Sequence, residues 1–366
     1  MSRRRITAAA SAGVTVLFAF AAAAQAPPAA SPPASRTPAA AQPPNGSTPP
    51  RPPAAPKPAA QAPAKPPAPK PATPAPPAPS HPGQEPDLAF GAYQRGYFLT
   101  AFHEATKRID AKHDPKAMTL LGELYANGLG VPAEDTKAAE WYALAAARGD
   151  PEAMFSLAMF RFGGRGGPRD RDEAARLLAA AAKLGHPAAA YDLGLLYIEG
   201  QQFPQDLARA AELFRVAADA GSSEAQYALA TLYKEGRGVP KDLTEAARLL
   251  GLAAVAELLD AQVEYAIALF NGSGIAKDEA RAAKLFRRAA MRGSPIAQNR
   301  LARLFTAGRG LPADPVEAIK WHLIAKAGGA GDPFLDEFAQ KQTPEVRASA
   351  ERAAEPWLNM IRLSRS

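Results

Sequence analysis

The segment AQYALATLYKEGRGVPKDLTEAARLLGLAA, residues 225–254, contains two helical patterns separated by a short glycine turn. Apolar residues recur every three to four positions on both sides of the turn, as in an amphipathic helix. Gly236 and Gly238 end the first pattern, because glycine adopts a left-handed turn most easily. Asp242 is placed to cap the second helix, with Glu245 three residues later. The segment therefore predicts a helix–turn–helix unit.

Glycine and alanine recur along the chain with a stride of 36 residues. The glycines that match Gly236 in this stride are Gly128, Gly164, Gly200, Gly272 and Gly308. Alanine repeats at three further positions of the unit, and six units run from Pro115 to Gly329 without an insertion or deletion. Such a period is typical of a solenoid, in which stacked units bury an apolar face that none can bury alone.

The Gly-x-Gly turn has the composition of a phosphate-binding loop, since Arg237 and Lys241 accompany its glycines. A P-loop follows a β-strand, whereas this turn follows a helical pattern in each unit. The turn is therefore interpreted as the connection that ends one helix and precedes the next, and no nucleotide site is predicted.

The unit resembles the Sel1-like repeat, a relative of the tetratricopeptide repeat. In the first unit the motif consists of Ala117, Leu121, Gly122, Tyr125, Gly128, Gly130, Val131, Pro132, Lys137, Ala138, Trp141, Tyr142, Ala145, Ala146 and Gly149. The resemblance implies an all-α fold, a right-handed α/α superhelical solenoid whose concave face binds proteins as an adaptor or regulator. Many envelope members of the family carry a disulfide in each repeat, and this chain departs from them because it has no cysteine.

The N-terminus, residues 1–26, has the pattern of a signal peptide. Three arginines at 3–5 precede an apolar run, and Ala24-Gln25-Ala26 is a small-x-small cleavage site. The uncharged stretch 6–24 leaves a membrane anchor open as the alternative, and the arginines leave both the Sec and the twin-arginine export routes open. Either way, the body of the protein is predicted to be exported and to face the periplasm.

Residues 27–86 are predicted to be a disordered Pro/Ala-rich linker, because they hold 24 of the 37 prolines and too little apolar surface to fold. Residues 1–86 carry eight Lys/Arg and one acidic residue, so the formal charge of +7 lies there. Residues 87–366 carry 35 basic and 35 acidic residues. This balance argues against nucleic acid as a partner, which would require a basic face.

Less regular segments flank the six repeats. Residues 87–114 are predicted to form an N-terminal capping hairpin, and residues 330–366 are predicted to form C-terminal capping helices, with Trp357 closing the last apolar edge. Within the array, Glu257 replaces the glycine that ends the second helix of the fourth unit. One hypothesis is that this helix runs on through Leu259 and alters the stacking of units four and five. The alternative is that the substitution is neutral and leaves the stacking unchanged.

No catalytic, cofactor or metal site is predicted, and the protein is not expected to be an enzyme. His186 occupies a helix-cap position of the repeat, and His322 occupies a position that is aromatic in other units, so we expect a packed core histidine there. His103-Glu104 lacks the second histidine of a zinc helix motif, and no serine lies in a Gly-x-Ser-x-Gly motif.

Candidate partner-binding residues are the variable, non-core positions of the first helices, which line the concave face of two-helix solenoids. These residues are Glu123, Met159, Leu195, Thr231, Ile267 and Arg303. Met159, Leu195 and Ile267 would form an exposed apolar stripe, unless they pack against neighbouring units. Three loop arginines recur in alternate turns and are the second candidate set: Arg165, Arg237 and Arg309.

The predicted function is a non-enzymatic protein–protein interaction scaffold in the bacterial cell envelope, with envelope proteins as partners and no cofactor. The alternative function is a structural tether, in which residues 6–24 hold the membrane or the linker contacts the cell wall. The sequence leaves the partner's identity and the oligomeric state open.

Overall fold

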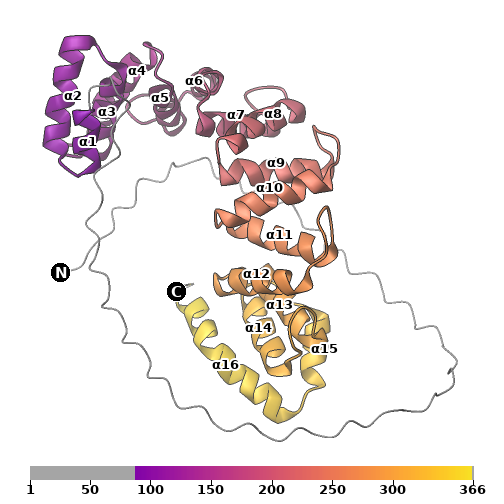
Figure 1. Cartoon of the computed structure of the whole chain (residues 1–366). Helices are drawn as coiled ribbons and strands as arrows, with labels where there is room; N and C mark the ends of the chain where they lie inside the picture. Colours follow the sequence, from indigo (N-terminus) through magenta and orange to yellow (C-terminus); the bar gives the residue numbers. More distant parts are fainter. Residues whose placement is uncertain (1–86, 365–366) are drawn as a thin grey trace, which may run out of the picture. The chain divides into compact units, whose positions relative to one another are not determined.

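The structure is a computed structural model that describes residues 87–364. Within this range it consists of sixteen α-helices and no β-strand (Figure 1). The predicted signal peptide and linker lie outside the described residues. None of the helices described combines the length and apolar character needed to span a membrane. The predicted all-α solenoid is confirmed.

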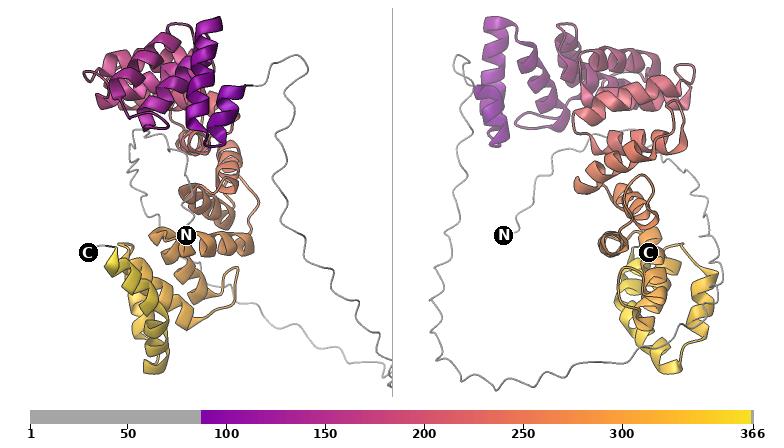
Figure 2. Two further views of the ribbon diagram at one scale, coloured as in Figure 1. Left: turned by 90° about the vertical axis from the view of Figure 1, so that its left-hand side faces the viewer. Right: turned by 45° about the vertical axis from the view of Figure 1, so that its right-hand side comes forward.

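Helices pair in the order in which they occur in the chain, as Figure 2 shows from two further sides. The first helices of the six repeats are α3 (Pro115–Asn127), α5 (Pro151–Gly163), α7 (Pro187–Glu199), α9 (Ser223–Glu235), α11 (Leu259–Asn271) and α13 (Pro295–Ala307). The second helices are α4 (Asp135–Ala146), α6 (Arg171–Lys183), α8 (Leu207–Asp219), α10 (Leu243–Val255), α12 (Glu279–Met291) and α14 (Pro315–Ala327). Each helix packs on the one before it and the one after it, so the core is continuous through the repeats.

The fourth repeat shows why these residues form two helices. The Ser222 hydroxyl accepts a hydrogen bond from the Ala225 backbone N–H at 3.2 Å, which caps α9, and Gly236 ends the helix with φ 71°. The Asp242 carboxylate then accepts from the N–H groups of Thr244 and Glu245 at 2.9 and 3.0 Å and caps α10. These contacts satisfy N–H groups that a helix start leaves without partners.

Small side chains bring the two helices of a repeat close together. The alanines of one column are completely buried: Ala145, Ala181, Ala217, Ala253, Ala289 and Ala325. At Gly194 in α7, an added Cβ would lie 2.6 Å from the ring of Phe214 in α8, and Phe214 itself is 0% exposed. The aromatic ring therefore occupies the space that a side chain at Gly194 would need.

The second glycine of the turn has a packing role that the sequence pattern did not reveal. Gly274 has φ 71°, and an added Cβ would lie 1.9 Å from the carbonyl oxygen of Leu243, at the start of α10 in the preceding repeat. Gly238 makes the same approach to Leu207, at 2.3 Å. These glycines are required both for the turn and for contact between successive repeats.

The hypothesis of a prolonged helix at Glu257 is wrong. Helix α10 ends at Val255 and α11 begins at Leu259, which is the same spacing as between α6 and α7, α8 and α9, and α12 and α13. Glu257 adopts the left-handed backbone conformation that glycine has at this position in other repeats, with φ 67°. Two arginines of the next repeat hold it there: the Arg288 Nη2 atom lies 2.5 Å from the Glu257 carboxylate, and Arg292 Nη1 donates to the Glu257 carbonyl oxygen at 2.8 Å. These contacts offset part of the cost of the left-handed backbone.

We expect Glu257→Gly to raise the free energy of unfolding by about 1 kcal/mol, because relief of left-handed strain exceeds the value of an exposed ion pair. The matched control is Gly221→Ala, at the equivalent position two helices earlier, where φ is 95° and no atom lies within 4 Å of an added Cβ. The free energy of unfolding of this control should fall by about 1 kcal/mol. Denaturant unfolding of both variants measures the difference, and destabilisation by Glu257→Gly would contradict the expectation.

Helices α1 (Leu88–Gln94) and α2 (Phe98–Lys112) precede the repeats, and α2 packs on α3. Helices α15 (Pro333–Gln340) and α16 (Pro344–Leu363) follow them, and α16 packs mainly on α14. The rings of Trp321 and Trp357 lie 5.5 Å apart at this contact. The apolar surface of the last repeat is therefore covered by the chain's own C-terminal helix.

Candidate functional site

The first-helix face is defined here by the position of Glu123 in each first helix, together with the positions three and four residues before it. The predicted residues Glu123, Met159, Thr231, Ile267 and Arg303 are all partly exposed on this face. Leu195 is buried, with 5% of its surface exposed, so the expectation that it continues an exposed apolar stripe is wrong. Residues four apart adjoin on a helix, and the large ring of Tyr191 precedes Leu195 by four.

Polar residues that were not predicted from the sequence lie beside these positions. The same 36-residue stride, started three or four residues earlier, would have found Tyr191, Asp192, Tyr227, Glu264 and Arg300. All five are partly exposed. Burial raises the pKa of Tyr191 and of Tyr227 to about 12, with nearby carboxylates adding to the effect. The face therefore combines tyrosine rings with carboxylates.

Asp192 and Arg300 are charged groups of this face without a hydrogen bond or ion pair to any described residue. Burial raises the pKa of Asp192 to about 6, and the nearby His186 opposes that rise. Burial likewise lowers the pKa of Arg300, and the neighbouring Arg303 lowers it further, while the carboxylates of Asp332 and Glu264 oppose the shift. Unpaired charges in partly buried positions cost stability unless a partner pairs them.

We expect Asp192→Asn to stabilise the isolated protein at pH 7.5, by on the order of 2 kcal/mol, and to have little effect at pH 4. The folded-state pKa lies above the ordinary aspartate value, so ionisation opposes folding as pH rises from about 4 to 6. Denaturant unfolding at the two pH values measures this. Equal effects of the substitution at both values would contradict the assignment.

A pocket of about 570 Å³ lies where α1, α3 and α5 meet on the first-helix face. Its lining includes Phe90 and Tyr93 from α1, Glu123 from α3 and Glu152 from α5. Three neutral groups donate to the Glu123 carboxylate: the hydroxyls of Tyr93 and Tyr142, at 3.4 and 3.1 Å, and the amide of Asn127, at 2.8 Å. They orient this carboxylate without neutralising its charge.

Other carboxylates of the pocket have partners from adjacent repeats. The Thr119 hydroxyl donates to the Asp150 carboxylate, which therefore joins α3 to α5 and does not cap α5. The Glu152 carboxylate lies 3.0 Å from Nε2 of His186, and this contact lowers the pKa of Glu152. Nδ1 of His186 accepts from the Ala189 N–H, so the predicted helix-cap role of His186 is confirmed.

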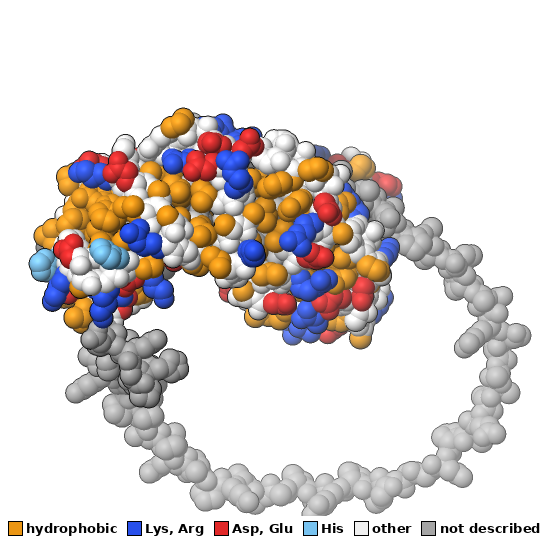
Figure 3. All heavy atoms as spheres, turned by 90° about the horizontal axis from the view of Figure 1, so that it is seen from above, with side chains coloured by type: hydrophobic (Ala, Val, Ile, Leu, Met, Phe, Trp, Pro, Cys, Tyr) orange, Lys and Arg blue, Asp and Glu red, His pale blue; other side chains and the backbone are white. Residues whose placement is uncertain are grey.

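The two helix layers differ in charge. The first helices α3, α5, α7, α9 and α11 carry eight acidic and three basic residues, whereas α13 carries only Arg300 and Arg303. The six second helices carry thirteen basic and nine acidic residues. Acidic and basic side chains are interspersed with hydrophobic ones on the face seen in Figure 3. The first-helix layer is therefore acidic over five repeats and basic at the sixth.

All three predicted loop arginines pair within the chain, two of them with an acidic residue of the preceding repeat. Arg165 donates to the Asp135 carboxylate at 2.6 and 3.1 Å and lies 4.2 Å from the ring centre of Phe160. Arg309 pairs in the same way with Glu279, at the start of α12 in the preceding repeat, with Nη2 2.5 Å from the carboxylate. Arg237 has no acid at the corresponding Leu207 and lies 3.4 Å from Glu235. Arg165 and Arg309 thus join successive repeats, and their role in partner binding stays a prediction.

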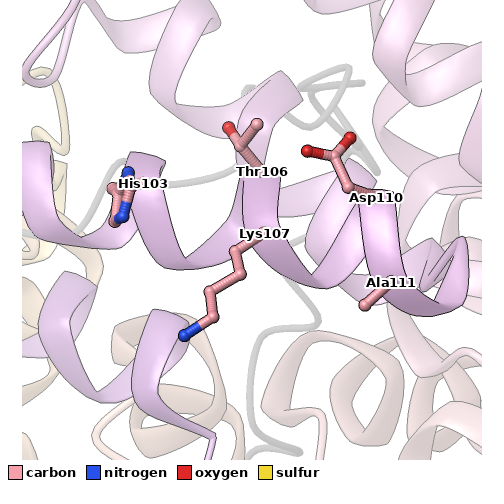
Figure 4. A pocket seen from close by; sticks show the side chains of 5 residues that line it. All are labelled: His103, Thr106, Lys107, Asp110 and Ala111. Carbon is pink, nitrogen blue, oxygen red and sulfur yellow. The ribbon is translucent and has the colours of Figure 1, made fainter.

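A separate depression on α2 offers no catalytic or metal-binding arrangement. Its lining residues are His103, Thr106, Lys107, Asp110 and Ala111, and Figure 4 shows Lys107 pointing away from Thr106 and Asp110. Residues 87–364 contain no group of three or more His, Asp or Glu side chains that could hold a metal ion.

His322 is packed in the core, with 1% of its surface exposed, as predicted. Its Nε2 atom lies 2.8 Å from the carboxylate of Asp336 in α15, and Lys326 lies 2.7 Å from the same carboxylate. The contact joins the last repeat to the helix that follows it.

Comparison with known proteins identifies the repeat. The sequence model of the Sel1 repeat family matches residues 115–150, 151–186, 187–222, 223–254, 259–294 and 295–329. A Sel1 repeat protein from Oxalobacter formigenes is similar in structure, with 27% identity and a TM-score of 0.54 over 66% of this chain and 97% of that one. The protective antigen c5321 of uropathogenic Escherichia coli, which displays an SLR fold, is 26% identical, with a TM-score of 0.52 over 74% and 67% of the two chains. No match was found among curated proteins.

Proposed function

Because the chain belongs to the Sel1 repeat family, whose members are generally protein-interaction scaffolds, we propose that it binds a protein partner through the first-helix face. The partner is an envelope protein, since the N-terminus has the sequence of an export signal. The protein acts as an adaptor or regulator and catalyses no reaction. Fold alone does not settle function, so the proposal depends on the surface that the fold presents.

One observation carries the proposal. Positions that bury the core repeat nearly the same residue in each unit, whereas the partly exposed position of the first helices carries Glu123, Met159, Thr231, Ile267 and Arg303 in turn. Rigid helices therefore present a row of side chains whose chemistry changes from repeat to repeat. Such a row, with tyrosines beside it, can recognise one extended segment of a partner.

Charge gives the partner segment a direction. The carboxylates Glu123 and Asp192 lie in the acidic part of the face, and Arg300 lies in its basic last repeat. A segment with basic residues over most of its length and an acidic end would pair with all three groups. Pairing also removes the cost of the unpaired Asp192 and Arg300 charges.

The test compares charge insertion on the two helix layers. Met159→Glu with Ile267→Glu should lower recovery of the partner by at least about tenfold in crosslinking from intact cells, since each places a charge in the contact. The matched control is Leu144→Glu with Leu252→Glu, two second-helix residues that are 44% and 45% exposed, which should leave recovery unchanged. Equal losses in the two pairs would contradict binding on the first-helix face.

The tether alternative has its own expected result. If residues 27–86 hold the cell wall, replacing them with a Gly/Ser spacer of equal length removes the localisation of the protein. An adaptor keeps its partner after that replacement and loses it after the face substitutions. The two functions are therefore distinguished by which variant fails.

A further inference from the structure

In the pocket between α1, α3 and α5, the Glu123 carboxylate forms no ion pair with any described residue. Its three hydrogen-bond donors are neutral, and they hold it in one orientation. The guanidinium of Arg165 interacts with Glu123 only at longer range, because its hydrogen bonds go to Asp135 and to the Ala126 carbonyl oxygen. The pocket therefore presents an oriented negative charge that a cation can pair with.

Two aromatic rings line the same pocket at an open surface. Phe90 is 49% exposed, and its ring lies 6.2 Å from that of Tyr93, with the two planes 18° apart. Burial raises the pKa of Tyr93, and the charge of Glu123 raises it further, so the hydroxyl keeps the proton that it donates to Glu123. A cation over an aromatic ring is attracted by its π electrons. One ligand can therefore contact a ring face and the carboxylate together.

The chain itself holds an arginine between a ring and a carboxylate at two other places. The guanidinium carbon of Arg165 lies 4.2 Å from the centre of the Phe160 ring, while the group donates to Asp135. Arg309 repeats the arrangement, with a phenylalanine ring 4.1 Å away and a glutamate as its acceptor. A guanidinium is planar, so it stacks on a ring and offers several donors to a carboxylate, whereas an ammonium does neither. The pocket supplies the ring and the carboxylate of this arrangement.

The remaining charges and the size of the pocket also suit an arginine side chain. The pocket is lined by four carboxylates and two cations: Asp87, Glu123, Asp150, Glu152, Arg108 and Lys116. Arg108 is already shared between two aspartates, and Lys116 is exposed. The pocket therefore carries net negative charge, which attracts a cation. Its volume of about 570 Å³ lies within the range of about 300–1,000 Å³ that is usual for ligand pockets.

We propose that this pocket anchors one arginine side chain of the partner segment, with the guanidinium stacked on Phe90 and paired with Glu123. The inference rests on the proposed function for the source of the arginine. Ser156 lines the pocket three residues before Met159, so a segment anchored here continues onto the exposed row at the second repeat. The anchor therefore sets the register of the segment along the first-helix face.

Ligand-observed NMR of the full chain tests the site, with N-acetyl-arginine amide as the probe. N-acetyl-citrulline amide is the matched control, because it has nearly the same shape and no charge. We expect the arginine probe to bind at least about tenfold more tightly than the citrulline probe. High salt should reduce this difference. Equal affinities of the two probes at low salt would overturn the proposal.

Two variants locate the bound probe. Glu123→Gln keeps the shape of the side chain and removes its charge, and it should weaken the arginine probe by about tenfold. Phe90→Leu removes the ring and keeps an apolar side chain, and it should weaken the probe by about threefold. Phe90 is half exposed, so this second variant keeps the fold. Glu140→Gln, at an exposed residue of α4, is the control and should change nothing. Unchanged affinity in either pocket variant would overturn the proposal.

Recovery of the partner by crosslinking in intact cells separates this site from the proposed function. The double variant Glu123→Gln with Phe90→Leu should lower recovery by about tenfold, as expected for an anchor residue. If recovery is kept in this variant and lost after Met159→Glu with Ile267→Glu, the first-helix face binds the partner and the anchor is overturned, whatever the probe does. If recovery is kept in both variants, the proposed function fails with it.

Discussion

Replacing Gly274 by alanine is expected to lower the free energy of unfolding by about 3 kcal/mol or more. The added Cβ would lie 1.9 Å from the Leu243 carbonyl oxygen, and the backbone would keep φ at 71°. The first effect is overpacking against backbone, worth about 1–3 kcal/mol, and the second is left-handed strain, worth about 1–2 kcal/mol. Denaturant unfolding followed by circular dichroism measures the total.

Gly293→Ala is the matched control for this prediction. Gly293 has φ 91°, and nothing lies within 4 Å of its added Cβ, so only left-handed strain is introduced. A loss of about 1 kcal/mol is expected. The difference in the free energy of unfolding between the two variants measures what the close approach of successive repeats costs when a Cβ is added. Equal losses would show that the second glycine of the turn serves the turn alone.

Phe214→Ala is expected to cost about 3–5 kcal/mol, because it removes a completely buried ring and leaves a cavity beside Gly194. In a solenoid each repeat contacts only its neighbours, so the loss should be local. Hydrogen exchange should therefore accelerate in α7, α8 and α9 and stay unchanged in α13 and α14. Leu252→Ala, at a residue that is 45% exposed, is the control and should cost under about 1 kcal/mol. Acceleration through the whole chain would contradict a stack of locally stabilised units.

Most of the fold could be predicted from the sequence, because helix starts, helix ends and the repeat period are local properties. The caps at Ser222 and Asp242 and the helix end at Gly236 are all found in the structure. The conformation of Glu257 was predicted wrongly, since the arginines that hold it lie 31 and 35 residues further along the chain. The close approach of Gly274 to Leu243 likewise depends on how one repeat sits on another.

The candidate site was less accessible to prediction. A fixed stride identifies equivalent positions, and it placed Glu123, Met159 and Ile267 on one partly exposed row. The stride does not show which side chains are buried, so the exposure of Leu195 was predicted wrongly. The stride also does not show which charged side chains form ion pairs, so the contact of Arg165 with Asp135 was missed. The assignment of these residues to a partner stays a prediction, because it depends on a second molecule.

Partner binding through the first-helix face is tested by placing a photo-crosslinking amino acid at Ile267, on that face, and separately at Leu252, on the neighbouring second helix. Both chains are produced in cells that naturally contain the protein and are irradiated in place. We predict one dominant protein adduct from position 267, absent from position 252 and lost when Met159 and Thr231 are changed to glutamate. Adducts at position 252 with none at position 267 would contradict binding through the first-helix face.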